Sequence, residues 1–385
     1  MKEKFLRELA DIQTGPFGSQ LHKEDYVADG TPIVTVEHLG NKMFSEQNLP
    51  RVSNTDKNRL KKYVLKQGDI VFSRVGSVDR CSYVDQKHDG WMFSGRCLRV
   101  RPTSEIDSEY LYYYFCLEET KQFVRNISVG ATMPSINTKL LGEVVVTFPE
   151  LEQQKRISGI LSAIDSKIEV NQKINDNLAV LLQTVYQERF GDVDKAVEQG
   201  VLSDICSYSK DRVAVSELDV STYFSTENML PRKAGSTEAT SLPTTPQTTA
   251  CHKGDTLISN IRPYFKKIVY CEDECGCSTD VLCFMPNQPQ YSAYLFSTLY
   301  ADKFFAFMVA GAKGTKMPRG DKQRIMTYPI VLPSEVALAE FNIIALPLIK
   351  QIYSNRAENK RLSLLRDTLL PKLMSGELDV SDIDL

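Results

Sequence analysis

The chain has 385 residues, of which 42% are hydrophobic, 25% charged and 9% aromatic, and its formal net charge is −3. These values are those of a folded protein with two or three domains and exclude a chain that is disordered throughout. No apolar run reaches the length that spans a bilayer, and residues 1–10 lack the apolar core of a signal peptide, so we expect a cytoplasmic protein.

The first part of the chain combines short strands, polar loops and a helix. Strands are expected at 9–12, 33–36, 68–74 and 97–100, where β-branched and aromatic residues follow turn residues. A helix rich in Tyr, Phe and Leu is expected from Ser108 to Phe123, and we interpret its aromatic residues as packing. A Gly-x-x-Met-Pro loop at 130–134 and a strand at 144–146 follow. This order lacks the βαβ alternation of a nucleotide-binding sheet.

The same order returns in the second part of the chain. Met133-Pro134 recurs as Met317-Pro318, and 317 − 133 = 184; Gly130 recurs as Gly314 at the same offset. Strand 68–74 has a counterpart at 254–260, and a second aromatic helix is expected at 292–307. A duplicated domain followed by a duplicated helix indicates a two-fold-like molecule. Such a molecule suits a target with two halves, for which duplex DNA is the obvious candidate.

Each copy ends in a long helix with a heptad pattern. Apolar and Asn residues step by four and three along the first helix: Ile157, Leu161, Ile164, Ile168, Asn171, Asn175, Leu178 and Leu182. The second helix repeats the pattern: Phe341, Ala345, Leu348, Ile352, Asn355, Asn359, Leu362 and Arg366. Leu181 and Leu365 offer an alternative phase. Because buried Asn fixes register, we expect the two helices to pack antiparallel with their four Asn residues meeting. The alternative is that these Asn residues face solvent or another subunit.

Charged and thiol groups are unevenly distributed. Basic residues flank both Met-Pro loops, in residues 121–139 and 310–324, while the C-terminal tail is acidic. Nine cysteines are expected to stay reduced in a cytoplasmic protein. Zinc binding by Cys271, Cys275, Cys277 and Cys283 is an open alternative, but their spacing has no C-x2-C pairs and the first copy lacks them.

Motifs for catalysis are absent from the sequence. There is no Gly-x-x-x-x-Gly-Lys-Ser/Thr loop for ATP, and Arg262-Pro263-Tyr264-Phe265 lacks the amide and the second Pro of an adenine methyltransferase motif. The four His residues are not at metal-ligand spacing. We therefore predict no catalytic residue, no bound metal and no cofactor in this chain.

The order of several segments resembles the specificity subunit of a type I restriction-modification system. The segments are Thr14–Ser19, Gly68–Arg74, Glu152–Ile157, Asn260–Phe265 and Leu369–Leu378. One departure is that Glu335–Glu340 replaces the Glu-Gln-Gln stretch of the first helix. The resemblance implies an α+β fold in which two mixed α/β target-recognition domains are separated by two long antiparallel coiled-coil helices, as a pseudo-two-fold repeat. The implied domains are 1–149 and 191–333, and the implied spacer helices are 150–190 and 334–385, the latter with the acidic tail.

The resemblance also implies partners. Each recognition domain would bind one half of an asymmetric, bipartite site in double-stranded DNA, and the helices would fix the gap between the halves. Two methyltransferase subunits using S-adenosylmethionine would dock on the helices, and restriction subunits using ATP and Mg would join them. The chain itself would be a non-catalytic subunit. Rival interpretations are a coiled-coil scaffold whose globular domains bind protein, or an enzyme with unfamiliar motifs.

Side chains that bind DNA are expected on the loops. Arg, Asn, Gln and hydroxyl groups can pair with base edges, and Lys can bind phosphates. In the first copy the candidates for base contacts are Ser19, Gln20, Arg74, Arg96, Thr132 and Ser135. In the second copy they are Asn260, Arg262, Lys316 and Arg319. The candidates for phosphate contacts are Lys139, Lys266, Lys313 and Lys322.

Overall fold

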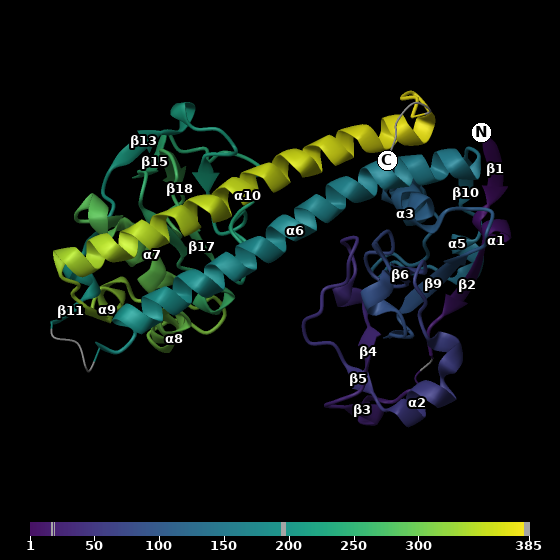
Figure 1. Ribbon diagram of the computed structural model, residues 1–385, viewed down its shortest axis with the longest axis horizontal. Helices are drawn as coiled ribbons and strands as arrows, with labels where there is room; N and C mark the ends of the chain where they lie inside the picture. The colour runs from purple at the N-terminus through teal and green to yellow at the C-terminus, as the bar shows by residue number, and fades with distance from the viewer. Residues whose placement is uncertain (17, 19, 194–197, 381–385) are drawn as a thin grey trace. The chain divides into compact units, whose positions relative to one another are not determined.

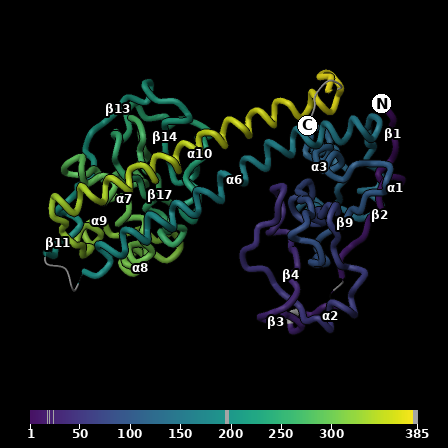
Figure 2. The backbone as a smooth tube through the Cα atoms, in the orientation of Figure 1, coloured from purple at the N-terminus to yellow at the C-terminus, as the bar shows by residue number. Residues whose placement is uncertain are grey.

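The computed structural model describes residues 1–16, 18, 20–193 and 198–380, and the chain forms two compact units (Figures 1 and 2). Unit 1 contains Met1–Glu169 and Asn359–Leu385, and unit 2 contains Val170–Glu358. Each unit therefore contains one copy of the repeat together with a segment of each long helix. The bounds of the globular copies and those of the compact units differ, because both long helices begin in one unit and end in the other.

Unit 1 contains three sheets. Its central sheet is antiparallel, in the order β2 (Ala10–Thr14), β9 (Cys97–Pro102), β6 (Ile70–Ser73), β7 (Cys81–Tyr83). A second sheet has the order β3 (Tyr26–Val27), β5 (Arg51–Val52), β4 (Thr31–Val34), β8 (Met92–Phe93), with β4 and β8 parallel. The terminal strands β1 (Lys2–Phe5) and β10 (Val145–Phe148) pair with each other. Short helices α1 (Leu6–Leu9), α2 (Asn54–Arg59) and α5 (Thr138–Leu141) connect these strands.

Unit 2 repeats the central sheet strand for strand. The order is β12 (Cys206–Tyr208), β19 (Val281–Pro286), β16 (Thr256–Ser259), β17 (Ile268–Tyr270), and β11 (Gln199–Val201) pairs with β20 (Pro329–Val331). The second sheet runs β13 (Arg212–Ala214), β15 (Gln247–Cys251), β18 (Cys275–Cys277), β14 (Tyr223–Phe224). The parallel pairs β4–β8 and β14–β18 correspond to each other. The other two strands of the sheet lie on the side of β4 in unit 1, where β5 pairs with β4, and on the side of β18 in unit 2, where β15 pairs with β18. The two copies thus share a core and differ in the outer strands.

Two expected elements differ in the structure. The helix expected at 108–123 is two helices, α3 (Ser108–Cys116) and α4 (Glu118–Asn126), and the repeat has α7 (Ser292–Tyr300) and α8 (Asp302–Ala310). Leu117 and Ala301 break the helices with extended ψ values of 135° and 142°, and an acidic residue then begins the second helix, where the helix dipole favours it. The strand expected at 33–36 ends at Val34, because the His38 ring accepts a hydrogen bond from the Thr35 N–H (2.9 Å) and a 3-10 helix begins.

The aromatic residues of α3 and α7 form the cores of the two units. Tyr110, Tyr113 and Phe115 are at most 1% exposed in unit 1, and Tyr294 is fully buried in unit 2. The phenol of Tyr110 donates to the Thr147 carbonyl (3.1 Å), so its polar end is satisfied although the ring is buried. The interpretation of these aromatic residues as packing is confirmed.

The long helices are α6 (Leu151–Phe190) and α10 (Glu335–Ser375). Their segments pair antiparallel within each unit, as the contacts between them show: Arg189 with Glu340 and Asn175 with Asn355 in unit 2, and Asp165 with Arg366 in unit 1. In unit 2, Asn355 Nδ2 donates to Asn175 Oδ1 (2.8 Å), and Asn171 Nδ2 donates to Glu358 Oε2 (2.7 Å). Asn175 and Asn355 therefore contact each other across the two helices. In unit 1, Asn359 Nδ2 donates to the carbonyl of Ile168 (3.2 Å). Burial settles the phase of the seam, since Leu182 is 1% exposed and Leu181 is 47% exposed.

Among the described helices, α10 is long and apolar enough to cross a membrane by length and composition, with a mean hydropathy of 1.4 over 18 residues, 28% of them buried. This corrects the expectation that no segment reaches that length. The finding is weak evidence for a membrane span, because a helix that packs against a core passes the same test. Here Leu338, Phe341 and Ala345 are buried in the core of unit 2.

All nine cysteines are free thiols. Five of them, Cys251, Cys271, Cys275, Cys277 and Cys283, are buried in one apolar cluster of unit 2. The Sγ atoms of Cys271 and Cys275 are 3.5 Å apart. Within the described residues, no group of His, Cys, Asp or Glu has an arrangement that could hold a metal ion. The thiols therefore pack as small apolar side chains.

Candidate nucleic-acid interface

Three loops meet at the end of β6 in unit 1. The chain leaves β6 at Arg74, whose N–H donates to the carbonyl of Arg96 (2.8 Å) and whose carbonyl accepts from Ile136 N–H (2.9 Å). Gly76 N–H donates to the carbonyl of Pro134 (2.8 Å). These bonds join the loop after β6, the loop before β9 and the Met-Pro loop. The arrangement places the side chains of several loops on one rigid scaffold, as a binding surface requires.

The same backbone bonds recur at the end of β16 in unit 2. Asn260 N–H donates to the carbonyl of Asp280 (2.8 Å), its carbonyl accepts from Gly320 N–H (3.3 Å), and Arg262 N–H donates to the carbonyl of Pro318 (2.8 Å). Arg262 has a φ of 51°, where the first copy has Gly76 with a φ of 76°. A non-Gly residue in this region costs free energy and is found mainly at functional sites. We call the joined loops of each unit its loop cluster: 74–76, 94–96 and 129–136 in unit 1, and 260–262, 278–280 and 313–320 in unit 2.

The Met-Pro loops are short hairpins. Val129 and Ser135 exchange two backbone hydrogen bonds of 2.8 Å, as do Lys313 and Arg319 at 2.9 Å. A Cβ on Gly130 would lie 2.8 Å from the carbonyl oxygen of Met133, so the loop needs glycine there, and its φ is 107°. Met133 and Met317 are 66% and 52% exposed. The repeated motif therefore builds a tight turn and holds its tip in solvent.

Several of the residues predicted for unit 1 lie together on its loop cluster. Arg74, Arg96 and Ser135 belong to three joined loops, and Thr132 is exposed at the Met-Pro tip. Arg74 Nη1 donates to the carbonyl of Gly95 (3.0 Å). Ser135 Oγ donates to the carbonyl of Val129 (3.1 Å), so this hydroxyl also supports the hairpin.

The other predicted residues of unit 1 lie elsewhere. Gln20 is outside the loop cluster, and its Oε1 accepts from the Tyr63 hydroxyl (2.7 Å), which gives it a structural role. Lys139 is exposed on α5. Ser19 lies outside the described residues.

The predicted residues of unit 2 have contrasting environments. Asn260 is 6% exposed, and its Oδ1 has no hydrogen-bond partner among the described residues. Lys316 and Arg319 are exposed on the Met-Pro hairpin, and Lys322 is exposed at the start of α9 (Lys322–Ile325). Arg262, which bears the strained φ described above, is half-buried.

Two predicted lysines are already paired with acids. Lys313 Nζ lies 2.6 Å from Asp321 Oδ2. Lys266 and Lys233 both contact Asp302 Oδ1 at 2.8 Å, and these two hydrogen bonds, the one from Lys233 first, lower the pKa of Asp302 to about 2. Phosphate binding by Lys313 or Lys266 would therefore compete with these ion pairs.

Asp280 was not predicted from the sequence, although it occupies the place of Arg96. Its backbone makes the hydrogen bond that Arg96 makes in unit 1, and 280 − 96 = 184, the offset of the repeat. Its Oδ1 lies 3.0 Å from Arg319 Nη2. The repeat offset was the signal that could have identified it.

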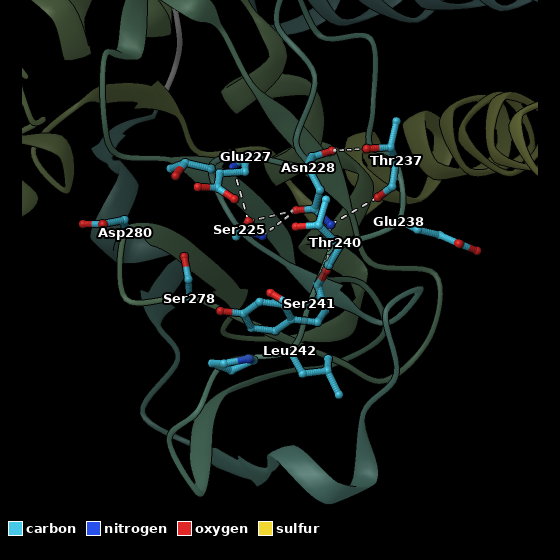
Figure 3. A pocket seen from close by; sticks show the side chains of 14 residues that line it. Ser225, Glu227, Asn228, Thr237, Glu238, Thr240, Ser241, Leu242, Ser278 and Asp280 are labelled. Atoms are coloured by element: carbon cyan, nitrogen blue, oxygen red, sulfur yellow. Dashed lines mark hydrogen bonds between the residues drawn. The ribbon is translucent and has the colours of Figure 1, made fainter. Parts of the chain in front are cut away.

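A cavity of about 340 Å³ adjoins each loop cluster. In unit 1 it is lined by Thr14, Arg74, Ser135 and Asn137, among others. In unit 2 hydroxyl and acidic side chains, including Glu227, Glu238 and Asp280, line it (Figure 3), and no Lys or Arg is among its fourteen described lining residues. The guanidinium of Arg74 therefore lines the first cavity, whereas carboxylates and hydroxyls, of which the hydroxyls can donate or accept, line the second.

Residues 1–179 match the family of the type I restriction modification DNA specificity domain. The chain is 25% identical over 311 residues to the type I restriction enzyme MjaIX specificity subunit of Methanocaldococcus jannaschii, covering 74% of this chain and 72% of that protein. It is 27% identical over 161 residues to the HindI specificity subunit of Haemophilus influenzae, covering 40% and 35%. The crystal structure of the S subunit of a type I restriction-modification system from M. genitalium has a similar fold, with a TM-score of 0.58, 17% identity and coverage of 97% and 95%.

The fold and the loop clusters define a protein with two related domains, each attached to paired helix segments. Within it, residues 1–179 are similar to type I restriction modification DNA specificity domains. The resemblance of the chain to type I specificity subunits and the expected α+β fold class are both confirmed.

Proposed function

We propose that this chain is the DNA-recognition subunit of a type I restriction-modification complex, and that each unit binds one half of a bipartite, asymmetric site in double-stranded DNA. The observation that carries the proposal is the duplicated loop cluster. The same backbone hydrogen bonds hold it in both units, while the side chains at equivalent positions differ. A constant scaffold with variable side chains is what recognition of two different half-sites requires.

Candidate base contacts follow from the geometry. Arg74, Arg96, Thr132 and Ser135 would contact the first half-site, and Asn260, Arg262, Lys316 and Arg319 the second. Lys139 and Lys322, which are exposed, would bind phosphates, and Lys266 and Lys313 would do so after leaving their acids. Gln20 is a weaker candidate, because its side chain is held by Tyr63.

The helices carry a repeated apolar surface for partner subunits. Val180 and Leu364 are 67% and 70% exposed, Leu181 and Leu365 are each 47% exposed, and both pairs are related by the repeat offset, since 364 − 180 = 184. Val180-Leu181 belongs to unit 2 and Leu364-Leu365 to unit 1. Two equivalent apolar patches support the docking of two copies of one partner, which would be the methyltransferase subunit. Val336 and Ile343 are exposed on α10 without an apolar counterpart on α6, so the two docking sites would differ in detail.

Catalysis would belong to the partners. The methyltransferase subunits would bind S-adenosylmethionine, and the restriction subunits would bind ATP and Mg, in the cytoplasm. This chain would act without a catalytic residue or a cofactor of its own, by selecting the DNA sequence and by setting the gap between its halves. The gap would follow from α6 and α10, which have 40 and 41 residues and hence are each about 60 Å long.

The test is methylation by the reconstituted complex. The chain is expressed with the methyltransferase subunit of the same system, and modified adenines are mapped by sequencing. We expect one bipartite motif with two unlike halves, and no methyl transfer by the chain alone. Methyl transfer by the chain alone, or the same motif when the chain is omitted, would contradict the proposal.

Matched variants assign each unit to a half-site. Arg319→Ala should reduce discrimination in the second half-site by roughly 1–3 kcal/mol and leave the first unchanged. Arg96→Ala should do the reverse. Equal loss of discrimination in both halves would contradict the assignment.

A further inference from the structure

The geometry points to a specific base pair for the second unit: Asp280 and Arg319 together recognise one G·C pair, with Arg319 on guanine and Asp280 on cytosine. This inference rests on the proposed function and names what one part of the unit 2 loop cluster binds. Its basis is the placement, charge and exposure of these two side chains.

The backbones of both residues are fixed. Asn260, which is 6% exposed, donates from its N–H to the carbonyl of Asp280 and accepts at its carbonyl from Gly320, the residue after Arg319. Arg319 also exchanges two hydrogen bonds of 2.9 Å with Lys313. The buried end of β16 therefore holds the two presenting loops together, so that little conformational entropy is lost when they bind.

The side chains, in contrast, remain accessible. Arg319 is 57% and Asp280 39% exposed, and Nη2 of the first lies 3.0 Å from Oδ1 of the second. A guanidinium has five N–H donors and a carboxylate accepts at two oxygens, so one mutual hydrogen bond leaves capacity on both groups. The contact therefore orients the guanidinium and the carboxylate relative to each other and leaves further donors and acceptors on both groups for the DNA bases.

This pair matches the major-groove edge of G·C. Guanine presents two acceptors, O6 and N7, to an arginine, and cytosine presents the N4 amino group to a carboxylate. With A·T, the arginine would meet either the N7 acceptor of adenine beside its N6 amino donor or the O4 acceptor of thymine beside its methyl group, so neither base offers it two adjacent acceptors. The cavity beside Asp280 has the carboxylate of Glu227 and the hydroxyl of Ser278 in its lining, and both groups can accept a hydrogen bond from an amino group (Figure 3).

The first copy provides the internal contrast. At the equivalent places unit 1 has Arg96 instead of Asp280 and Ser135 instead of Arg319. The acid–arginine pair is therefore a property of unit 2 alone, and its effect should be confined to the second half-site.

The experiment uses the complete complex of this chain with its methyltransferase subunit. Binding is measured on a set of duplexes in which each base pair of the second half-site is replaced in turn. The variants are Asp280→Ala, Arg319→Ala and the double variant, with Asp273→Ala as the control, because Asp273 is an exposed acid of unit 2 that lies outside the loop cluster. Discrimination in the first half-site shows that each variant is folded.

We expect both single variants to lose discrimination at the same base pair, which is G·C, by roughly 5- to 150-fold, the range of one good bidentate contact. The double variant should lose little more than either single variant, because the two residues act together. The control should match the unaltered complex.

Three results would overturn the inference: loss at two different base pairs, loss at an A·T pair, or unchanged discrimination in both variants. In each of these the complex still selects DNA sequences, so the proposed function stands. A complex that shows no sequence preference even without substitutions would overturn the proposed function itself, and the inference with it.

Discussion

Replacement of Asn175 by leucine should destabilise the paired helix segments of unit 2. Asn355 is 5% exposed, and its Nδ2 donates to Asn175 Oδ1 at 2.8 Å. Without Asn175 a buried amide loses its acceptor, which costs about 1–3 kcal/mol. The double variant Asn175→Leu/Asn355→Leu should recover this loss, because both buried amides are then gone and Gln351, which donates to Asn355, is exposed to water.

Hydrogen exchange of the whole chain measures this effect, since local opening reports local stability. Amides in 170–190 and 335–358 should exchange roughly 5- to 150-fold faster in the single variant, and about as slowly as in the unaltered chain in the double variant. Asn177→Leu is the matched control, because Asn177 is exposed on the same helix. If the effects of the two single variants simply added in the double variant, the Asn pair would carry no coupling and the reasoning would be refuted.

Three further predictions concern the helices, the core and pH. Insertion of four residues into both α6 and α10 should add about 6 Å to each helix, at about 1.5 Å per residue. Because one base pair spans about 3.4 Å, the gap in the methylated motif should lengthen by about two base pairs, and an unchanged gap would contradict the role of the helices. Phe341→Ala should cost about 3–5 kcal/mol in local stability by hydrogen exchange, because the ring is fully buried against Tyr186 and Phe190; a change below about 1 kcal/mol would contradict this. Hydrogen bonding to Glu274 raises the pKa of His252. The contact therefore stabilises the folded state fully below the unfolded pKa of about 6.5, and this stabilisation is lost as the pH rises through the folded pKa. The variant His252→Gln should remove this pH dependence from hydrogen exchange in β15.

The helical half of the fold could be predicted from the sequence because its signal is local and repetitive. Heptad steps placed Ile157 and Leu161 in the seam, and both are at most 1% exposed. The phase at the end of the seam was ambiguous, because Leu181 and Leu182 are equally apolar, and only packing against the core of unit 2 selects Leu182. The exact partner of each Asn residue depends on the stagger of the helices, which pairs Asn175 with Asn355 and places Asn171 beside Glu358, and the sequence does not give this stagger.

The loop cluster could be predicted only in part. The Met-Pro repeat indicated two loops, but their hairpin form and the hydrogen bonds that join the loops of Arg74 and Ser135 come only from the structure. The contact between Arg319 and Asp280 joins residues 39 positions apart, and nothing in their local sequence indicates it. The sequence also does not indicate the contact of Gln20, whose amide oxygen accepts a hydrogen bond from Tyr63, 43 positions away.

The division of the chain between the units has a consequence for biosynthesis. The N-terminal domain buries Ile157 and Leu161 in one core with Leu370, Leu373 and Val380, which are translated only after the whole of the second domain. The first of the two domains to be translated is therefore completed after the second, and it keeps an open apolar flank while the second is made. Loss of the last turns of α10 would damage the N-terminal domain before it affected the domain that immediately precedes this helix.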